Sequence, residues 1–233
     1  MGQSGARLFL SQFWNQYHTT GAIWPSGQAL ARELAYYVAN PLDASAVNGR
    51  KILEVGPGTG TVTRAILAAL QPTDQVTLVE INPEFANHLR ERLRTEPDWQ
   101  RVADRVTIRT EAIQDFAAND QFDVIVSGLP LNNFSIETVE AILAGLDRLA
   151  KPGATVSFFE YIAIRHFKAV VSGSAERARL RGVAAALEKF LGKRELRRRA
   201  IVGNMPPAWA HHVQRSEQSE PSGATGSASA AGV

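Results

Sequence analysis

The chain has 233 residues, of which 45% are hydrophobic and 21% charged, and its formal net charge is +2. With no cysteine it forms neither disulfide bonds nor thiolate metal sites, and its five histidines lack acidic partners at metal-binding spacing. No apolar run is long enough to span a membrane and no secretory signal is evident, so we expect a cytoplasmic protein without a metal.

The first predicted unit, residues 1–40, is an amphipathic helix followed by a lid segment. Residues 6–17 place a dense stripe of aromatic side chains, including Phe13 and Trp14, on one face of a helix. Such a stripe either packs on its own domain or lies in a membrane interface, where aromatic side chains are favoured. A glycine-rich loop then leads into a second predicted helix at 27–38.

Strands and helices alternate from residue 51 to residue 161. The predicted strands are 51–55, 75–79, 105–109, 122–127 and 154–161, and the predicted helices are 61–70, 83–95 and 135–150. Alternation of this kind predicts a parallel sheet with right-handed crossovers. Two further short strands are predicted at 200–203 and 209–213.

Charge is distributed unevenly along the chain. Residues 165–199 contain eleven basic and three acidic residues, a net charge of +8, and are predicted as one or two basic helices, most clearly at 175–191. This segment either meets an anionic partner, nucleic acid or a membrane surface, or is a solvated helix face. Residues 216–233 are rich in Ser, Gly and Ala and are predicted to be disordered.

A glycine-rich turn follows the first strand of the alternating region. Glu54 precedes glycines at 56, 58 and 60, whereas a dinucleotide fingerprint would have its third glycine at position 61. The acidic side chain would repel a pyrophosphate but attract a cationic ligand. Glu80 ends the second strand, where an acid accepts both hydroxyls of a ribose. The pattern therefore favours a cationic adenosine ligand over a dinucleotide or an empty structural turn.

This turn resembles motif I of class I S-adenosylmethionine-dependent methyltransferases. The resemblance implies a Rossmann-like α/β fold: a mostly parallel seven-stranded sheet, helices on both faces and an antiparallel C-terminal hairpin. The methyltransferase domain would span 41–215, with 165–199 as a basic helical insertion. It also implies a set of residues that bind S-adenosylmethionine: Glu54, Gly56, Pro57, Gly58, Gly60, Glu80, Ile81, Glu111, Ala112, Ser127, Leu129 and Pro130.

The stretch after the fourth strand, 126–134, corresponds to motif IV, which faces the methyl acceptor. Ser127 and Pro130 match the pattern of adenine methyltransferases, but Leu131 stands where those enzymes place a stacking aromatic residue. The stretch instead resembles bacterial phospholipid N-methyltransferases, as do the segments at 21–26 and 204–208.

The resemblance implies transfer of methyl groups to a lipid headgroup amine, with phosphatidylethanolamine converted towards phosphatidylcholine. Alternatives are an ornithine-lipid N-methyltransferase, an RNA or DNA adenine methyltransferase, and a cofactor-binding module without catalysis. Nucleic acid is the less favoured partner, and no oligomeric state is predicted. We expect a peripheral protein at the anionic inner face of the cytoplasmic membrane. Because an ammonium must lose a proton before it attacks, four candidates for proton acceptance or orientation are Tyr161, Tyr17, His18 and Glu160.

Overall fold

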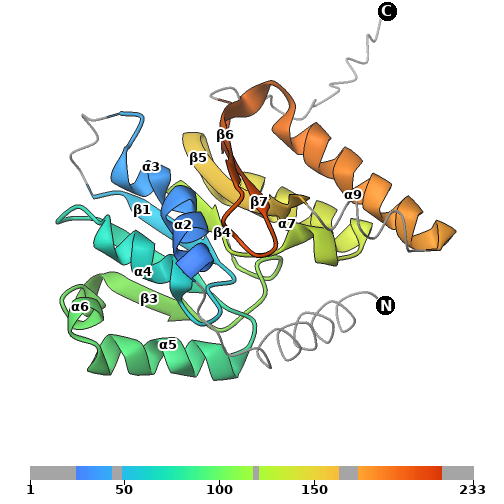
Figure 1. The fold of residues 1–233 in the computed structure, drawn as a ribbon. Coiled ribbons are helices and arrows are strands. Elements are labelled where there is room, and N and C mark those ends of the chain that lie inside the picture. Colours follow the sequence, from blue (N-terminus) through green and yellow to red (C-terminus); the bar gives the residue numbers. More distant parts are fainter. Residues whose placement is uncertain (1–24, 44–48, 118–120, 163–172, 217–233) are drawn as a thin grey trace, which may run out of the picture.

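The computed structural model describes residues 25–43, 49–117, 121–162 and 173–216 (Figure 1). The predicted aromatic helix at 6–17, most of the loop at 21–27 and nearly all of the predicted disordered tail lie outside these residues, as do two catalytic candidates, Tyr17 and His18.

The described residues form a seven-stranded sheet in the order β3-β2-β1-β4-β5-β7-β6. Strands β1 to β5 are parallel, and β7 runs antiparallel to both β5 and β6. This confirms the predicted fold class. The strands are β1 (Lys51–Val55), β2 (Gln75–Val79), β3 (Val106–Arg109), β4 (Phe122–Ser127), β5 (Ala150–Tyr161), β6 (Glu195–Ile201) and β7 (Ala208–Gln214).

Helices cover both faces of the sheet (Figure 1). Side-chain caps mark the start of two of them: Asn82 Oδ1 accepts from Glu84 N at 2.9 Å, and Ser135 Oγ accepts from Thr138 N at 3.3 Å. The helices are α2 (Pro25–Leu34), α3 (Tyr36–Ala39), α4 (Thr61–Ala68), α5 (Pro83–Thr95), α6 (Pro97–Gln100), α7 (Ile136–Leu149) and α9 (Ser174–Leu191), with 3-10 turns η2 (Ala103–Arg105), η3 (Leu131–Asn133) and η4 (Gly192–Arg194).

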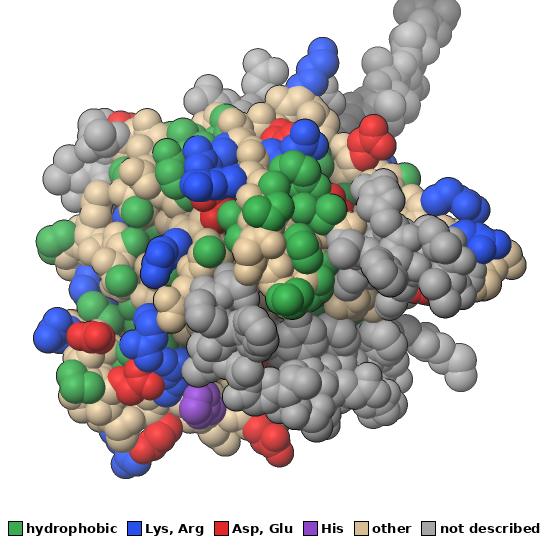
Figure 2. All heavy atoms as spheres, in the orientation of Figure 1, with side chains coloured by type: hydrophobic (Ala, Val, Ile, Leu, Met, Phe, Trp, Pro, Cys, Tyr) green, Lys and Arg blue, Asp and Glu red, His purple; other side chains and the backbone are tan. Residues whose placement is uncertain are grey.

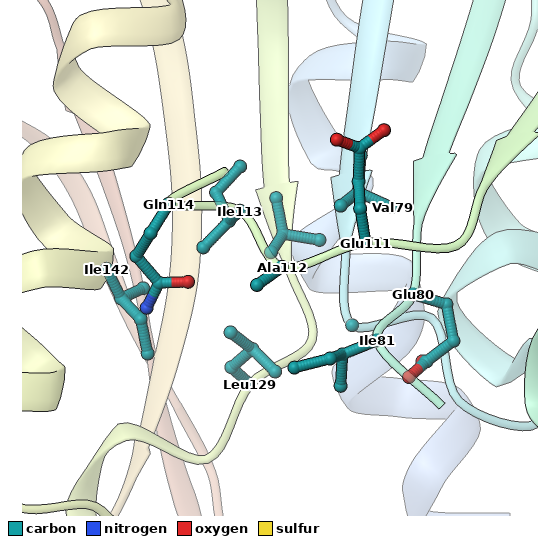
Figure 3. Close-up of a pocket in the computed structure, with 11 residues that line it drawn as sticks. Val79, Glu80, Ile81, Glu111, Ala112, Ile113, Gln114, Leu129 and Ile142 are labelled. Atoms are coloured by element: carbon teal, nitrogen blue, oxygen red, sulfur yellow. The ribbon is translucent and has the colours of Figure 1, made fainter. Parts of the chain in front are cut away.

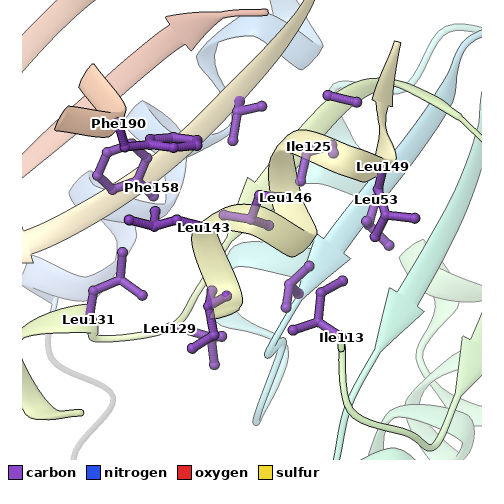
Figure 4. Close-up of a cluster of buried hydrophobic side chains, with 14 of the residues drawn as sticks. Leu53, Ile113, Ile125, Leu129, Leu131, Leu143, Leu146, Leu149, Phe158 and Phe190 are labelled. Atoms are coloured by element: carbon purple, nitrogen blue, oxygen red, sulfur yellow. The ribbon is translucent and has the colours of Figure 1, made fainter. Parts of the chain in front are cut away.

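Two hydrophobic clusters lie on opposite faces of the sheet because successive side chains of a strand alternate in direction. In β1, Ile52 packs towards α2, α4 and α5, whereas Leu53 packs towards α7 and α9. Figure 4 shows the cluster that contains Leu53, in which Phe158 of β5 contacts Phe190 of α9 with ring centroids 5.8 Å apart. Helix α9 is therefore part of the core and not a detached lid.

The C-terminal part of the predicted basic insertion is a strand, not a helix. Residues 195–199 belong to β6, which pairs with β7 along the edge of the sheet. Tertiary contacts of its arginines stabilise the strand although the composition favours a helix. Arg197 and Arg199 form ion pairs with Glu33 on α2, and the Arg198 guanidinium lies over the Trp209 ring at 4.9 Å. The first strand of the predicted hairpin therefore begins five residues earlier than expected from the sequence.

Glu33 joins α2 to this hairpin and is only 5% exposed. It accepts from Arg197 Nε at 2.7 Å and from an Arg199 guanidinium nitrogen at 3.1 Å. Burial opposes its ionisation, but the hydrogen bond from Arg197 and the nearby positive charges hold its pKa below the ordinary value. We call this cluster of Glu33, Arg197 and Arg199 the α2 clamp.

Replacing Glu33 by glutamine is expected to lower the free energy of unfolding by about 2 kcal/mol at pH 7, since both guanidinium groups are partly exposed. A carboxyl group whose pKa is lowered by folding stabilises the protein above its unfolded pKa, near 4.5, and this contribution is lost as the pH falls further. Urea unfolding at pH 7 and at pH 3.5 should thus show a smaller difference between parent and variant at the lower pH. A constant difference would contradict the assignment.

Candidate cofactor and acceptor site

The glycine turn between β1 and α4 needs glycine for conformational reasons. Gly56, Gly58 and Gly60 have φ values of 68°, 55° and 83°, in the left-handed region that other residues rarely adopt. A Cβ at Gly56 would lie 2.3 Å from Leu129 Cδ2, so this residue also allows the turn to approach the motif IV loop.

A pocket opens at the carboxyl ends of β1, β2 and β4, where open α/β sheets bind ligands (Figure 3). It has a volume of about 340 Å³, which includes the solvent at its mouth. The pocket brings together six of the predicted cofactor residues: Gly56, Glu80, Ile81, Glu111, Ala112 and Leu129. Five more residues complete its wall: Val55, Val79, Ile113, Gln114 and Ile142.

Glu80 is fully buried at the end of β2 and bridges two turns. Its Oε2 accepts from Gly58 N at 3.0 Å, and its Oε1 accepts from Asn82 N at 2.8 Å. Burial raises its pKa, while the backbone donors of Asn82, Gly58 and Ile81 oppose the shift. Since each carboxylate oxygen can accept more than one hydrogen bond, Glu80 retains acceptor capacity for a pair of hydroxyl groups.

Glu54 is fully buried beside the glycine turn, and neither carboxylate oxygen has a hydrogen-bond partner among the described residues. Burial raises its pKa to about 8; the hydroxyl and backbone N–H of Thr63, which are near the carboxyl group but outside hydrogen-bonding geometry, oppose this shift, and the charge of Glu80 adds to it. An unpaired buried carboxyl group is costly unless something compensates it. A cationic ligand above the turn would supply that compensation, so the residues present fit S-adenosylmethionine, whose sulfonium and ammonium groups are both positive.

The turn after β3 contributes a residue that sequence reasoning missed. In Figure 3 the Gln114 amide points towards Leu129 and Ile142, whereas the Glu111 carboxylate turns away from them. Glu111 accepts from Arg109 Nε at 3.0 Å. The predicted acid beside the adenine is thus engaged with its neighbour, and Gln114 is the polar side chain directed towards the apolar wall. The available signal was a polar residue directly after Ala112 and Ile113.

The motif IV loop lies directly against the glycine turn. A Cβ at Gly128 would stand 2.7 Å from the Gly56 carbonyl oxygen, so only glycine permits this contact. Ser127 is fully buried, and its Oγ accepts from Leu129 N at 3.4 Å. Pro57 and Pro130 occupy these two loops without lining the pocket.

Helix α9 holds the same loop from the other side. Arg179 donates to the Asn132 carbonyl at 3.1 Å and to the Phe134 carbonyl, and it also binds Glu176. Asn132 in turn accepts from Tyr161 N through Oδ1 at 3.0 Å. The basic segment therefore supports the motif IV loop, a role that its charge alone does not predict.

Leu131 does not face an acceptor in this structure. It is fully buried in the cluster that contains Phe158, as Figure 4 shows. No stacking aromatic side chain stands at this position, and the interpretation of Leu131 as a mark of a non-nucleobase acceptor stays a prediction.

The remaining catalytic candidates lie on opposite faces of β5. Tyr161 is 6% exposed, and its ring packs edge-on against Phe159 at 5.2 Å. Glu160 is 8% exposed and lies on the α9 side, where its Oε1 is 3.5 Å from His211 Nε2. The described residues hold no group of three or more side chains suited to bind a metal ion.

Comparison with known proteins places this site in a class. Residues 53–156 match the family described as "Methyltransferase domain". The chain is 29% identical over 148 residues to an ornithine lipid N-methyltransferase of Singulisphaera acidiphila, covering 64% of this chain and 73% of that protein. It is 33% identical over 113 residues to a ubiquinone/menaquinone biosynthesis C-methyltransferase of Burkholderia vietnamiensis, covering 48% of this chain and 44% of that protein.

Solved structures share the fold at lower identity. N-methyltransferase NodS from Bradyrhizobium japonicum WM9, bound to S-adenosyl-L-homocysteine, superimposes with a TM-score of 0.57 at 13% identity, covering 83% of this chain and 89% of that one. The O-methyltransferase TomG from Streptomyces achromogenes, with SAM bound, gives 0.59 at 20% identity, with 89% and 90% covered. With the matched domain, these findings define an S-adenosylmethionine-dependent methyltransferase, and they confirm the predicted enzyme class and methyl donor.

Proposed function

We propose that this methyltransferase acts on the headgroup amine of a membrane lipid. The observation that carries the proposal is the relative that is named an ornithine lipid N-methyltransferase, which shares most of its length with this chain. The motif IV stretch and the segments at 21–26 and 204–208, which resemble phospholipid N-methyltransferases, support the same acceptor class. Phosphatidylethanolamine and ornithine lipid are the two headgroups to distinguish, because both present a primary ammonium.

S-adenosylmethionine supplies a methyl group that its sulfonium already activates. The residues of the chain therefore have to bind and align rather than activate it. Glu80 would hold the ribose hydroxyls, Glu54 would balance positive charge beside the turn, and Gln114 with the apolar wall would contact the base. The motif IV loop, which includes 127–130 and which we call the acceptor loop, would bring the acceptor amine against the glycine turn.

A lipid acceptor requires contact with a bilayer, and the described helices include none long and apolar enough to cross one. The loop between β6 and β7 offers an apolar contact instead, since Val202 is 76% and Met205 71% exposed. Figure 2 shows hydrophobic side chains gathered over this hairpin. The loop lies at the ligand edge of the sheet because Ala208 pairs with Tyr161 at the end of β5. We propose peripheral attachment to an anionic membrane surface through this edge.

Replacing Val202 and Met205 by serine is expected to weaken vesicle binding about tenfold or more, since each large apolar side chain contributes on the order of 1 kcal/mol at an interface. Leu42→Ser is the matched control: Leu42 is 50% exposed but precedes β1, at the opposite edge of the sheet. Cosedimentation with anionic vesicles measures both. Equal binding of the double variant and the parent protein would contradict attachment through the hairpin loop.

The acceptor is tested by comparing the transfer of labelled methyl groups to different substrates in separate reactions. The protein is incubated with labelled S-adenosylmethionine and with vesicles of phosphatidylethanolamine, vesicles of ornithine lipid, ribosomal RNA or a quinone precursor. Label in one lipid and not the other names the headgroup. Label in RNA or in the quinone ring, at a rate above that for both lipids, would overturn the proposal.

A further inference from the structure

A line of three titratable side chains leads from the end of β5 to the surface. Glu160 Oε1 lies 3.5 Å from His211 Nε2, and His211 Nδ1 lies 2.7 Å from Glu195 Oε1. His211 belongs to β7 and Glu195 to the edge strand β6, so each residue comes from a neighbouring strand. The Glu160 and His211 side chains are 11% and 3% exposed, whereas that of Glu195 is 27% exposed.

Two features of this cluster are unlike an ordinary structural contact. Glu160 Oε2 is shielded from solvent and has no hydrogen-bond partner among the described residues. The His211 ring is held flat against Phe158, with centroids 5.3 Å apart and an interplanar angle of 20°, which fixes both ring nitrogens between two carboxylates. A buried carboxylate with a free oxygen, beside a titratable ring in a ligand-binding edge, indicates a functional site.

The opposite face of the same strand shows what a structural cluster looks like here. His212, fully buried, has Nδ1 2.8 Å from Ser157 Oγ and Nε2 3.5 Å from Glu33. Glu33 is compensated by two arginines in the α2 clamp. Among the described residues, no lysine or arginine forms an ion pair with Glu160 or Glu195.

Three arginines on the elements around Glu160 and His211 are engaged elsewhere. Arg179 of α9 binds the acceptor loop and Glu176, and Arg194 of η4 binds Asp147 and the Phe190 carbonyl. Arg198, opposite His211 on β6, lies over Trp209. His211 is thus the side chain that contacts both carboxylates.

Glu160 is also connected to the acceptor loop through the next residue of β5. Its neighbour Tyr161 is bonded through backbone N–H and C=O to the Asn132 side chain, at 3.0 and 3.4 Å. The same loop touches the glycine turn at Gly128. The end of β5, the acceptor loop and the cofactor turn are therefore held as one unit.

We propose that Glu160, His211 and Glu195 form a proton relay that deprotonates the acceptor ammonium and releases its proton at the surface. This inference rests on the proposed amine methylation. Glu160 takes one proton from the ammonium nitrogen, which frees the lone pair. The nitrogen forms a bond to the methyl carbon as the carbon–sulfur bond breaks, and that electron pair stays on sulfur. Glu160 passes its proton to His211 Nε2, the Nδ1 proton moves to Glu195, and Glu195 loses it to water.

The test compares Glu160→Gln and His211→Asn with His212→Asn, a control at the adjacent position of the same strand. All variants are first compared with the parent for thermal stability and for S-adenosylhomocysteine affinity by calorimetry. Methyl transfer to the identified lipid is then followed from pH 6 to pH 10. Glu160→Gln is expected to lose on the order of 100-fold in kcat near pH 7 and to recover as the amine deprotonates in solution, near pH ~10. His211→Asn should show the same trend more weakly, and His212→Asn should keep the parent pH profile.

A second acceptor separates proton removal from packing. A lipid whose headgroup ends in an aminooxy group, with an oxygen bonded to the nitrogen, is a weak base and is already neutral near pH 7. With this acceptor, the methyl-transfer rates of Glu160→Gln and His211→Asn should approach the parent rate. A pH profile parallel to that of the parent, or an equal defect with both acceptors, would overturn the relay while leaving amine methylation intact. A parent protein that methylates no lipid amine would overturn the proposed function and the relay with it.

Discussion

Gly58→Val is expected to lose at least about 100-fold in affinity for S-adenosylmethionine, roughly 2.7 kcal/mol, while the sheet stays folded. Gly58 has a φ of 55°, and its N–H donates to Glu80. A β-branched side chain disfavours this backbone conformation and places atoms at the turn, so both the turn and the orientation of Glu80 are disturbed.

Gly153→Val is the matched control for backbone strain. Gly153 has a φ of 78°, nothing lies within 4 Å of an added Cβ, and the residue lies near the beginning of β5, away from the ligand edge. Calorimetry with S-adenosylmethionine and thermal unfolding are measured on both variants. Equal loss of affinity in the two, or unchanged affinity in Gly58→Val, would show that the turn does not bind the methyl donor.

Glu54→Gln is expected to remove a pH dependence of cofactor binding. Because burial raises the pKa of Glu54 to about 8, the side chain is mostly neutral at pH 7 in the free protein. A cationic ligand favours the ionised form, so binding expels a proton and the parent affinity gains up to tenfold per pH unit until about pH 8. The α-amino group of the ligand also titrates near ~8; the ratio of parent to variant affinities removes this contribution.

The Glu54→Gln substitution should also change how the stability of the ligand-free protein depends on pH. A carboxyl group whose folded pKa exceeds its unfolded value, near 4.5, loses stability as the pH rises from there to about 8. The free energy of unfolding of the parent should therefore fall by up to ~1.4 kcal/mol per pH unit relative to that of Glu54→Gln across this window.

The proton release on cofactor binding is measured separately. Calorimetry of S-adenosylmethionine binding at pH 6, 7 and 8, in buffers of different ionisation enthalpy, counts the protons that binding releases. Identical proton release by parent and variant would rule out Glu54 as the source.

The parallel part of the fold could be read from the sequence because its signals are local. The glycines of the β1–α4 turn are adjacent to the strand that requires them, and Asn82 with Pro83 marks the start of α5 within two residues. The carboxylate at the end of β2 is placed by the period of the alternation. Such features depend on neighbours in the chain, which sequence patterns record directly.

The features that the sequence did not predict depend on distant residues. The strand character of 195–199 comes from pairing with β7 and from Glu33, which is 164 positions from Arg197. His211 had no acidic partner at short spacing, yet two carboxylates reach it from the adjacent strands. The inward direction of Leu131 follows from the packing of η3 on the core. Register and packing of this kind are tertiary properties.

The α2 clamp also bears on the order in which the chain folds. Closing a loop of this length costs entropy that local contacts do not repay, so an ion pair spanning 164 positions is expected to form late. Contacts absent from the folding transition state leave the folding rate nearly unchanged but slow unfolding. The clamp would therefore lengthen the lifetime of the native state, and its loss should appear in the unfolding limb of a chevron plot.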